Sequence, residues 1–362
     1  MMRAISLAVL LMASVVVASP QQIKYPVNLP VEVASFPGFT EGIVFDHGGN
    51  AFVSNGRKLW KVTPDGKASV WVSELGVARG YPFNGHKILG DDSHLVVDVG
   101  NQAIVHLDPN GNIIRKITEC EDLPVLIPND ITLDPNGLGF YFTDSHTGIV
   151  CYVDNQWNTN WVTGGQSSGQ RVHHYPTYTN PKTGKKYDTS RAKGYRQFNP
   201  NGIVIRPDGK TLLVAEADRF RILAYDVLAP GKVGPAKQFA FLPLPLPTDL
   251  DVGPLVPESH VGEAGRPDGM CLDADGNLYI AYHGTGWVVV IDKQGRLIRM
   301  LPSGARNLSN VAFWGPNMDQ LYITGSVSMA DRTGVLLRLD LSGLGIHGLK
   351  ILPPATKSPW PE

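Results

Sequence analysis

The sequence repeats one short pattern six times, and this repeat restricts the possible fold more than any other feature. Each copy contains a turn of the Asp-Gly or Asn-Gly kind, an alternating run, a second turn and another run. The copies lie at 45–66, 89–111, 133–155, 205–227, 272–295 and 314–343. Their strands are expected to begin near Ala51, His94, Phe140, Thr211, Leu278 and Leu321, which gives a base period of about 43 residues with two longer intervals.

A period of this length, carrying four short strands, is typical of one blade of a β-propeller. The sequence therefore predicts an all-β protein, a six-bladed β-propeller with four-stranded blades, as a single domain over residues 20–362. The 39 glycines and 28 prolines fit a chain with many tight turns. The run VEVASF (31–36) precedes the first copy, and we expect it to join the last blade and close the ring.

The two longer intervals locate insertions near 156–197 and 229–265. The first is polar and rich in Gly and Tyr, and the second contains the Pro-rich stretch LPLPLPTDL. Long loops in a compact domain are either functional segments or tolerated surface insertions, and both interpretations apply here.

The first residues have the layout of a secretory signal peptide over 1–19. Arg3 precedes an apolar run from Ala8 to Ala18, and polar Gln21 and Gln22 follow. An uncleaved membrane anchor is the alternative, but the run is short for a span. We therefore expect a secreted or periplasmic protein with no membrane contact after cleavage. The net charge of −1 gives no electrostatic basis for binding nucleic acid.

Three cysteines are too few for a disulfide framework. Cys120 and Cys151 flank one strand region, so they either pair or remain as thiols. Cys271 lies in an apolar run and is expected to be a buried thiol.

A polar residue stands immediately before the apolar run of every copy, about ten residues ahead of the expected strand start. The innermost strand of each propeller blade lines the central channel, so these side chains should meet on the axis. Two carboxylates and several amides would be costly to bury unpaired, whereas a divalent cation such as Ca²⁺, Mg²⁺ or Mn²⁺ would satisfy them. A hydrogen-bonded polar plug is the alternative. The six positions are Glu41, Asn84, Asn129, Asn201, Asp268 and, in the last copy, Ser309 or Asn310.

Three stretches carry a resemblance to a known family: IPNDITLDPNGLGFYFTD, NPNGIVIRPDGKTLLVAEADRFRILAYDV and GRPDGMCLDADGNLYIAYHGTGWVVVID. They resemble the senescence-marker-protein, gluconolactonase and luciferin-regenerating-enzyme group of six-bladed propellers. The resemblance implies a catalytic divalent cation, with Ca²⁺ favoured over Mg²⁺, Mn²⁺, Zn²⁺ or Fe²⁺. Its ligands would be Glu41, Asn129, Asn201 and Asp268. The sugar-binding Arg of the lactonase branch has no counterpart beside Ile127, so a preference for sugar lactones is not implied.

These observations predict an exported, metal-dependent lactonase acting on a small lactone or ester. Asp268 is the expected general base, with direct nucleophilic attack as the alternative. Asn84 and Asn129 would orient substrate oxygens, and His146 and His283 are candidate substrate contacts, with a purely structural role as the alternative for each histidine. Competing interpretations are an organophosphate or aryl-ester hydrolase with the same site, a non-catalytic ligand-binding propeller, and a metal-free propeller like strictosidine synthase.

Overall fold

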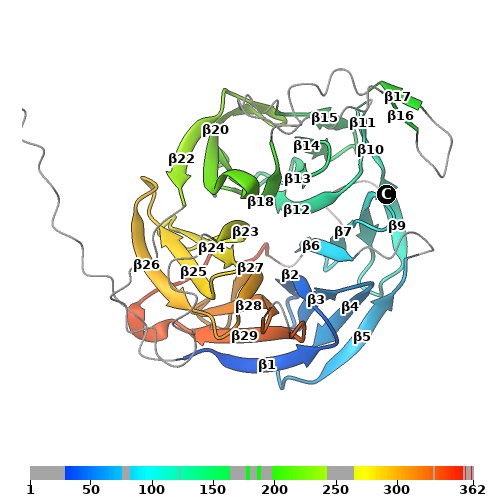
Figure 1. The fold of residues 1–362 in the computed structure, drawn as a ribbon. Coiled ribbons are helices and arrows are strands. Elements are labelled where there is room, and N and C mark those ends of the chain that lie inside the picture. The colour runs from blue at the N-terminus through cyan, green and yellow to red at the C-terminus, as the bar shows by residue number, and fades with distance from the viewer. Residues whose placement is uncertain are drawn as a thin grey trace, which may run out of the picture.

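The computed structural model describes residues 29–75, 82–121, 123–163, 177–179, 186–188, 198–242, 265–328, 331–353, 355 and 360. The predicted signal peptide over 1–19 lies outside the described residues. Six antiparallel sheets stand around a central axis as the blades of a β-propeller, which confirms the predicted fold (Figure 1).

The blades follow the order of the chain. Blade 1 consists of β2 (Thr40–Phe45), β3 (Ala51–Asn55), β4 (Lys58–Val62) and β5 (Ala68–Ser73). Blade 2 consists of β6 (Phe83–Ile88), β7 (His94–Asp98), β8 (Ala103–Leu107) and β9 (Ile113–Ile117). Blade 3 consists of β12 (Pro128–Leu133), β13 (Gly139–Asp144), β14 (Ile149–Asp154) and β15 (Thr159–Trp161).

Blade 4 carries a short additional strand, so it has five strands instead of the predicted four. It consists of β18 (Pro200–Ile205), β19 (Thr211–Glu216), β20 (Arg221–Ala229), β21 (Lys232–Val233) and β22 (Lys237–Phe241). Blade 5 consists of β23 (Arg266–Leu272), β24 (Leu278–His283), β25 (Trp287–Ile291) and β26 (Leu297–Pro302).

Blade 6 combines both ends of the propeller. Its strands are β27 (Asn307–Trp314), β28 (Gln320–Ser326), β29 (Gly334–Asp340) and, from the start of the chain, β1 (Val31–Phe36). The pairing of β1 with β29 confirms that VEVASF closes the ring. The remaining short elements are β10 (Glu119–Cys120), β11 (Leu123–Pro124), β16 (Thr177–Thr179), β17 (Lys186–Asp188) and the 3-10 turns η2 (Ala217–Arg219) and η5 (Ser342–Leu344).

The Asp-Gly and Asn-Gly turns of the repeat form one recurring structure. In four copies an Asp accepts hydrogen bonds from both the backbone N–H and the side-chain amide of an Asn four residues later. This arrangement holds the turn between the first and second strands, or between the third and fourth. The pairs are Asp46–Asn50, Asp108–Asn112, Asp154–Asn158 and Asp273–Asn277.

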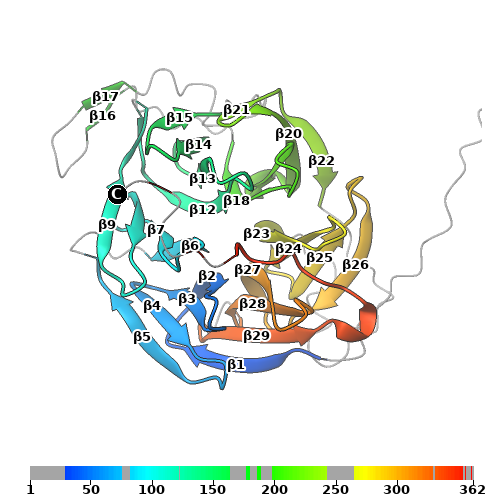
Figure 2. The same cartoon turned by 180° about the vertical axis from the view of Figure 1, so that it is seen from behind.

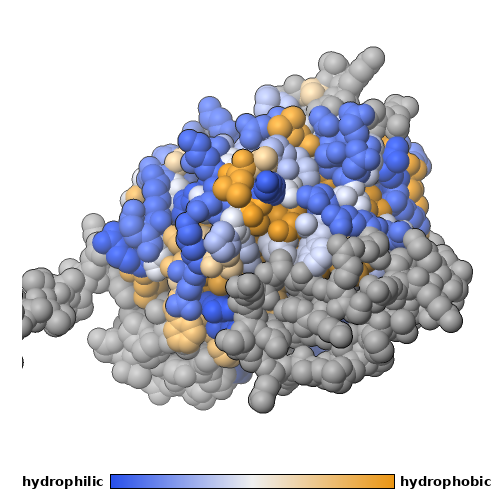
Figure 3. Space-filling model, turned by 90° about the horizontal axis from the view of Figure 1, so that it is seen from above, coloured by the Kyte–Doolittle hydropathy of each residue, from blue (hydrophilic) through white to orange (hydrophobic). Residues whose placement is uncertain are grey.

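The core is divided among the interfaces between neighbouring blades. Six clusters of buried hydrophobic side chains occur in the described residues, and each joins two consecutive blades. Both faces of every sheet are therefore covered only when the ring is complete. On the side of the molecule seen in Figure 3, the coloured surface is mostly hydrophilic, with hydrophobic residues gathered in small patches.

The outer strands β15 and β22 lie within the two stretches expected as insertions. They were not recognised as strands because these stretches lack a clear apolar run. Cys120 and Cys151 form a disulfide that joins the segment after blade 2 to β14. In the described part of the chain, no helix is both long and apolar enough to cross a membrane.

Candidate active site

Every inner strand carries a β-bulge at or beside the polar position picked out by the repeat. In β2, for example, Thr40 pairs with Asn55 and Ile43 with Val53, so one extra residue is accommodated at 41–42. The same irregularity occurs in β6, β12, β18, β23 and β27. A bulge redirects the side chains beside it, and bulges are common next to active sites. Here they define an axial ring of Glu41, Asn84, Asn129, Asn201, Asp268 and Ser309.

The inner strands contact one another in a closed circuit around the axis, from β2 through β6, β12, β18, β23 and β27 back to β2. Hydroxyl groups from the second strands fix the backbone of the axial ring. Ser54 donates to the carbonyl oxygen of Asn84, Thr143 to that of Asn201, and Thr324 to that of Glu41, at 2.8, 2.7 and 2.5 Å. Each hydroxyl belongs to the preceding blade, so adjacent blades hold the ring in position.

Glu41 and Asp268 place two carboxylates close together in this ring. Burial, followed by the charges of Asp268 and Asp130, raises the pKa of Glu41 well above its usual range. Burial and Asp130 likewise raise the pKa of Asp268, although hydrogen bonds from the Asn201 side chain and the Gly269 N–H act in the opposite direction. The protein alone therefore leaves excess negative charge at this site.

One position further along each inner strand, four blades have glycine and the other two have Asp130 and Asn310. These two side chains come from opposite blades and hydrogen-bond to each other across the axis. A Cβ added to Gly85 would lie 2.5 Å from the Asp130 carboxylate, and one added to Gly269 would lie 2.3 Å from the Asn310 side chain. The glycines thus leave room for an axial floor, formed by Asp130 and Asn310, beneath the axial ring.

Asp130 was not among the predicted site residues. Burial raises its pKa, against the effects of the nearby Lys87 charge and of hydrogen bonds from the N–H groups of Ile131 and Ile203 and from the Asn310 side chain. Its signal in the sequence is that Asp130 replaces the glycine that follows Glu41, Asn84, Asn201 and Asp268.

The donors of the axial ring fit a hard divalent cation. The Oδ1 atom of Asn201 is buried and has no hydrogen-bond partner, while the rest of that amide bonds to Asp268. An unpaired buried acceptor beside two carboxylates is the arrangement that a bound cation would satisfy. Glu41, Asn201 and Asp268, with Asn129 on the neighbouring inner strand, are the residues that would hold it. Among the described residues, no cluster of three His, Cys, Asp or Glu suited to a metal occurs. Glu41 and Asp268 would therefore need the amide oxygens of Asn129 and Asn201 to complete a ligand set.

His283 lies beside the axial ring, with its Nδ1 atom 4.0 Å from Oδ2 of Asp268. The same nitrogen is 2.9 Å from the carbonyl oxygen of Leu308, to which it must donate, so Nε2 carries the lone pair in the neutral ring. Burial lowers the pKa of His283 overall, against the raising effect of that hydrogen bond. A neutral imidazole is therefore available next to Asp268.

The other two predicted substrate contacts differ in their surroundings. Asn84 is half-buried in the axial ring, and its carbonyl oxygen faces Gly42. His146 is exposed in the turn after β13. In that turn Asp144 accepts hydrogen bonds from the N–H groups of Leu126, Ile127, His146 and Thr147, which fixes the segment leading to Asn129.

The fold and this geometry define a six-bladed propeller with an oxygen-rich site on its axis. A sequence profile of the SMP-30/gluconolactonase/LRE-like family matches residues 39–327. The chain belongs to this family, as the resemblance predicted.

Two curated relatives illustrate the range of similarity. Gluconolactonase of Zymomonas mobilis is 26% identical over 326 residues, covering 83% of this chain and 80% of the relative. Pentonolactonase XacC of Haloferax volcanii is 33% identical over 93 residues, but these cover only 22% of this chain and 32% of that relative. The chain thus spans about a third of this second relative's length.

Solved structures support the fold. A structure described as a putative gluconolactonase has a TM-score of 0.63 at 18% identity, with 90% of this chain and 96% of the other covered. A calcium-binding protein, regucalcin, from Agrobacterium tumefaciens has a TM-score of 0.62 at 18% identity, with 92% and 98% covered.

Proposed function

We propose that the protein is an exported, divalent-metal-dependent lactonase. The observation that carries this proposal is the axial ring, where the orphaned Asn201 oxygen stands beside the carboxylates of Glu41 and Asp268. Membership of a family that includes gluconolactonases supports the reaction class. The Cys120–Cys151 disulfide supports export, because disulfides persist in oxidising compartments.

When bound, a divalent cation supplies a Lewis acid for the carbonyl oxygen of a lactone and lowers the pKa of a water molecule. We expect Ca²⁺, with Mg²⁺, Mn²⁺, Zn²⁺ and Fe²⁺ as the other candidates. Glu41, Asn129, Asn201 and Asp268 would hold the ion.

The remaining chemistry belongs to the side chains. Asp268 takes a proton from the attacking water as it adds to the lactone carbonyl. His283, neutral and 4.0 Å from Asp268, orients that carboxylate or the substrate. Asn84 and Asn129 donate hydrogen bonds to substrate oxygens through their side-chain amides. Ring opening then gives a hydroxy acid, with the proton passing to the departing alkoxide oxygen.

The test is lactone ring opening, followed as acid release over a panel of lactones, before and after chelation. Asp268→Asn should lower kcat/KM by at least about 10²-fold, because the base is lost while the size is kept. Asp275→Asn is the matched control, since Asp275 is an exposed turn residue seven positions later in the same blade. Activity that survives both chelation and Asp268→Asn would refute the proposal. Hydrolysis of aryl esters or organophosphates without lactone activity would redirect it to the other substrate class.

A further inference from the structure

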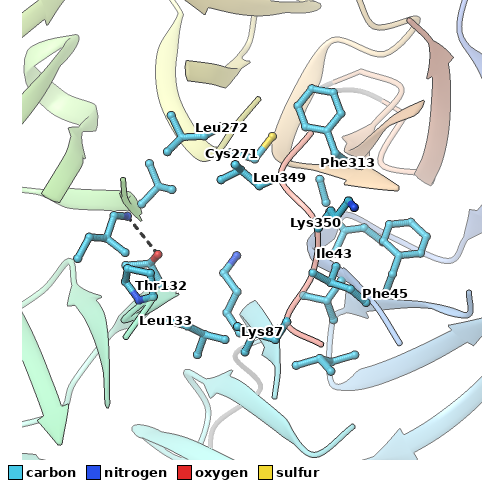
Figure 4. Close-up of a pocket in the computed structure, with 18 of the residues that line it drawn as sticks. Ile43, Phe45, Lys87, Thr132, Leu133, Cys271, Leu272, Phe313, Leu349 and Lys350 are labelled. Atoms are coloured by element: carbon cyan, nitrogen blue, oxygen red, sulfur yellow. Dashed lines mark hydrogen bonds between the residues drawn. The ribbon is translucent and has the colours of Figure 1, made fainter. Parts of the chain in front are cut away.

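A cavity lies at the opposite end of the channel from the axial ring, beyond the axial floor. It has a volume of about 380 Å³. Residues two positions after the floor position on each inner strand line it, because side chains on a strand alternate in direction. They are Val44, Lys87, Thr132, Val204, Cys271 and Ala312. We call it the rear cavity (Figure 4).

The chain itself covers part of the mouth of this rear cavity. A C-terminal strap, residues 346–353, crosses the axis on this side of the propeller (Figure 2). Its residues Leu349–Leu352 contribute to the lining. The rear cavity is therefore a pocket enclosed by six blades and a strap, and the axial floor lies between it and the proposed lactonase site.

The lining combines apolar walls with positive charge. The side chain of Lys87 extends into the middle of the rear cavity, and Lys350 lies on the strap at its edge (Figure 4). None of the described lining residues is acidic. Cys271 is a free thiol, as predicted, but it is half-buried in this wall rather than buried, because its position on β23 faces the axis.

Lys87 lacks a close anionic partner among the described residues. Burial raises the pKa of Asp130 and the Lys87 charge acts against it, but this carboxylate already accepts hydrogen bonds from the N–H groups of Ile131 and Ile203. The hydroxyl of Thr132 accepts from the N–H of Ile205 at 3.2 Å, which leaves its own hydrogen free to donate. The Lys87 ammonium and the Thr132 hydroxyl are the two donors on the inner strands of this largely apolar pocket, while Lys350 and His47 contribute to its lining. Two neighbouring donors match a single carboxylate better than a phosphate, which needs more donors.

We propose that the rear cavity binds a small hydrophobic carboxylate, with the carboxylate on Lys87 and an unbranched alkyl chain along the apolar walls. A medium-chain fatty acid has this chemistry, and the cavity volume falls within the range of small-molecule sites. This binding does not depend on the proposed lactonase activity or on a metal.

The experiment is calorimetric titration of the purified, chelator-treated protein with decanoate and with decanol. Decanoate should bind with one-to-one stoichiometry and about 10- to 100-fold more tightly than decanol, because it alone forms a charge-assisted hydrogen bond. Lys87→Met should abolish this preference, and Ala312→Trp should fill the cavity and remove binding of both. Lys58→Met, at an exposed lysine of β4, is the matched control and should bind as the parent does.

The comparison of decanoate with decanol on the unaltered protein needs no variant, so it remains decisive if Lys87→Met does not fold. Equal affinity for the two compounds, or no binding of decanoate, would overturn the proposal. An unchanged preference in Lys87→Met would also overturn it. Decanoate binding that is lost in Asp268→Asn but kept in Ala312→Trp would place the carboxylate at the axial ring instead.

Discussion

At the scale of single residues, the axis is organised by two successive positions on each inner strand. The first position provides the oxygen donors of the axial ring, and the second is glycine except at Asp130 and Asn310. Besides burial, the negative charge of Asp130, which lies in the axial floor beneath the axial ring, raises the pKa of both Glu41 and Asp268. The same carboxylate therefore closes the channel and strengthens the need for a cation above it.

This arrangement predicts how the metal-free protein responds to pH. Because the pKa of Glu41 is raised, the folded protein binds more protons than the unfolded chain above the usual carboxylate range. The free energy of unfolding should therefore fall as pH rises through that window. Glu41→Gln removes the charge, so at pH 8 in chelator it should be more stable than the parent by roughly 1–3 kcal/mol. Urea unfolding at pH 5 and pH 8 measures this.

Added Ca²⁺ should make the parent more stable than Glu41→Gln. The ion stabilises the parent by binding its folded state, and it should stabilise the variant much less because one ligand is lost. Glu32→Gln, at an exposed position of β1, should change little under either condition. If Glu41→Gln is the less stable protein at pH 8 in chelator, the charge at Glu41 is compensated by the protein itself and does not require a cation.

The six positions of the axial ring could be picked out from the sequence, because a polar residue that recurs at the same point of a repeat can be recognised without coordinates; their role as a metal site stays a prediction. It did not reveal the axial floor. The signal was present in the dipeptides EG, NG, ND, NG, DG and SN, in which only two copies lack glycine at the second position. Its meaning depends on the fact that blades 3 and 6 face each other across the axis, which is a property of the closed ring.

At the scale of elements, the inner strands and the closing outer strand β1 were predictable, whereas the outer strands β15 and β22 were not. Middle strands such as β8 and β25 are fully buried and appear in the sequence as largely apolar runs. An inner strand such as β12 has a polar residue near its start and apolar residues after it, at the same place in every repeat. The outer strand β15 is half-buried to exposed and β22 is mostly exposed, and their polar residues resemble loop sequence. The strap was also missed, since residues 346–353 have no strand periodicity and are held by individual hydrogen bonds.

One of these bonds makes attachment of the strap sensitive to pH. His47 contacts the Asp92 carboxylate through Nδ1 at 2.7 Å and the Leu352 carbonyl oxygen through Nε2 at 2.8 Å. Both partners are acceptors, so both bonds require the protonated ring. Burial lowers the pKa of His47, but the bonds to Leu352 and Asp92 outweigh it and raise the pKa overall.

A histidine whose pKa is raised in the folded protein stabilises it fully at pH values below the usual histidine pKa. This stabilisation is lost as the pH rises through the raised pKa of the folded state. Hydrogen exchange at the Ala355 amide, two residues beyond the strap and bonded to the Gly90 carbonyl oxygen, should therefore accelerate above this pH after correction for intrinsic rates. His47→Gln should exchange fast at every pH. His347→Gln, at an exposed strap histidine bonded to Asn317, is the control. A strap equally protected at pH 6 and pH 9 in the parent would show that His47 does not hold it.

At the scale of the whole molecule, stability depends on closing the ring. Each core cluster joins two blades, so a propeller that opens between blades 6 and 1 exposes one interface completely. The closing strand β1 lies near the start of the described chain, whereas its partner β29 lies near the end. This separates the propeller from a linear repeat, whose terminal units need only one neighbour.

The residue that tests this closure is Phe36, the last residue of β1. It is 3% exposed and belongs to the cluster that contains Tyr322 and Leu336 of blade 6 together with Ile43 of blade 1. Its ring also packs edge-on against Trp60, with centroids 5.5 Å apart. Phe36→Ala should lower the free energy of unfolding by about 3–5 kcal/mol, because it leaves a cavity at the point where the ring is joined.

Val31→Ala is the matched control, because Val31 lies on the same strand but is 54% exposed, and its substitution should change the stability by less than about 0.5 kcal/mol. Urea unfolding followed by tryptophan fluorescence and by circular dichroism measures both variants. If closure unites the blades, the two signals should coincide in the parent as one cooperative transition. Should Phe36→Ala prove as mild as Val31→Ala, the ring would be held by β1 backbone pairing alone, and the blade 6–blade 1 interface would contribute little to the stability of the propeller.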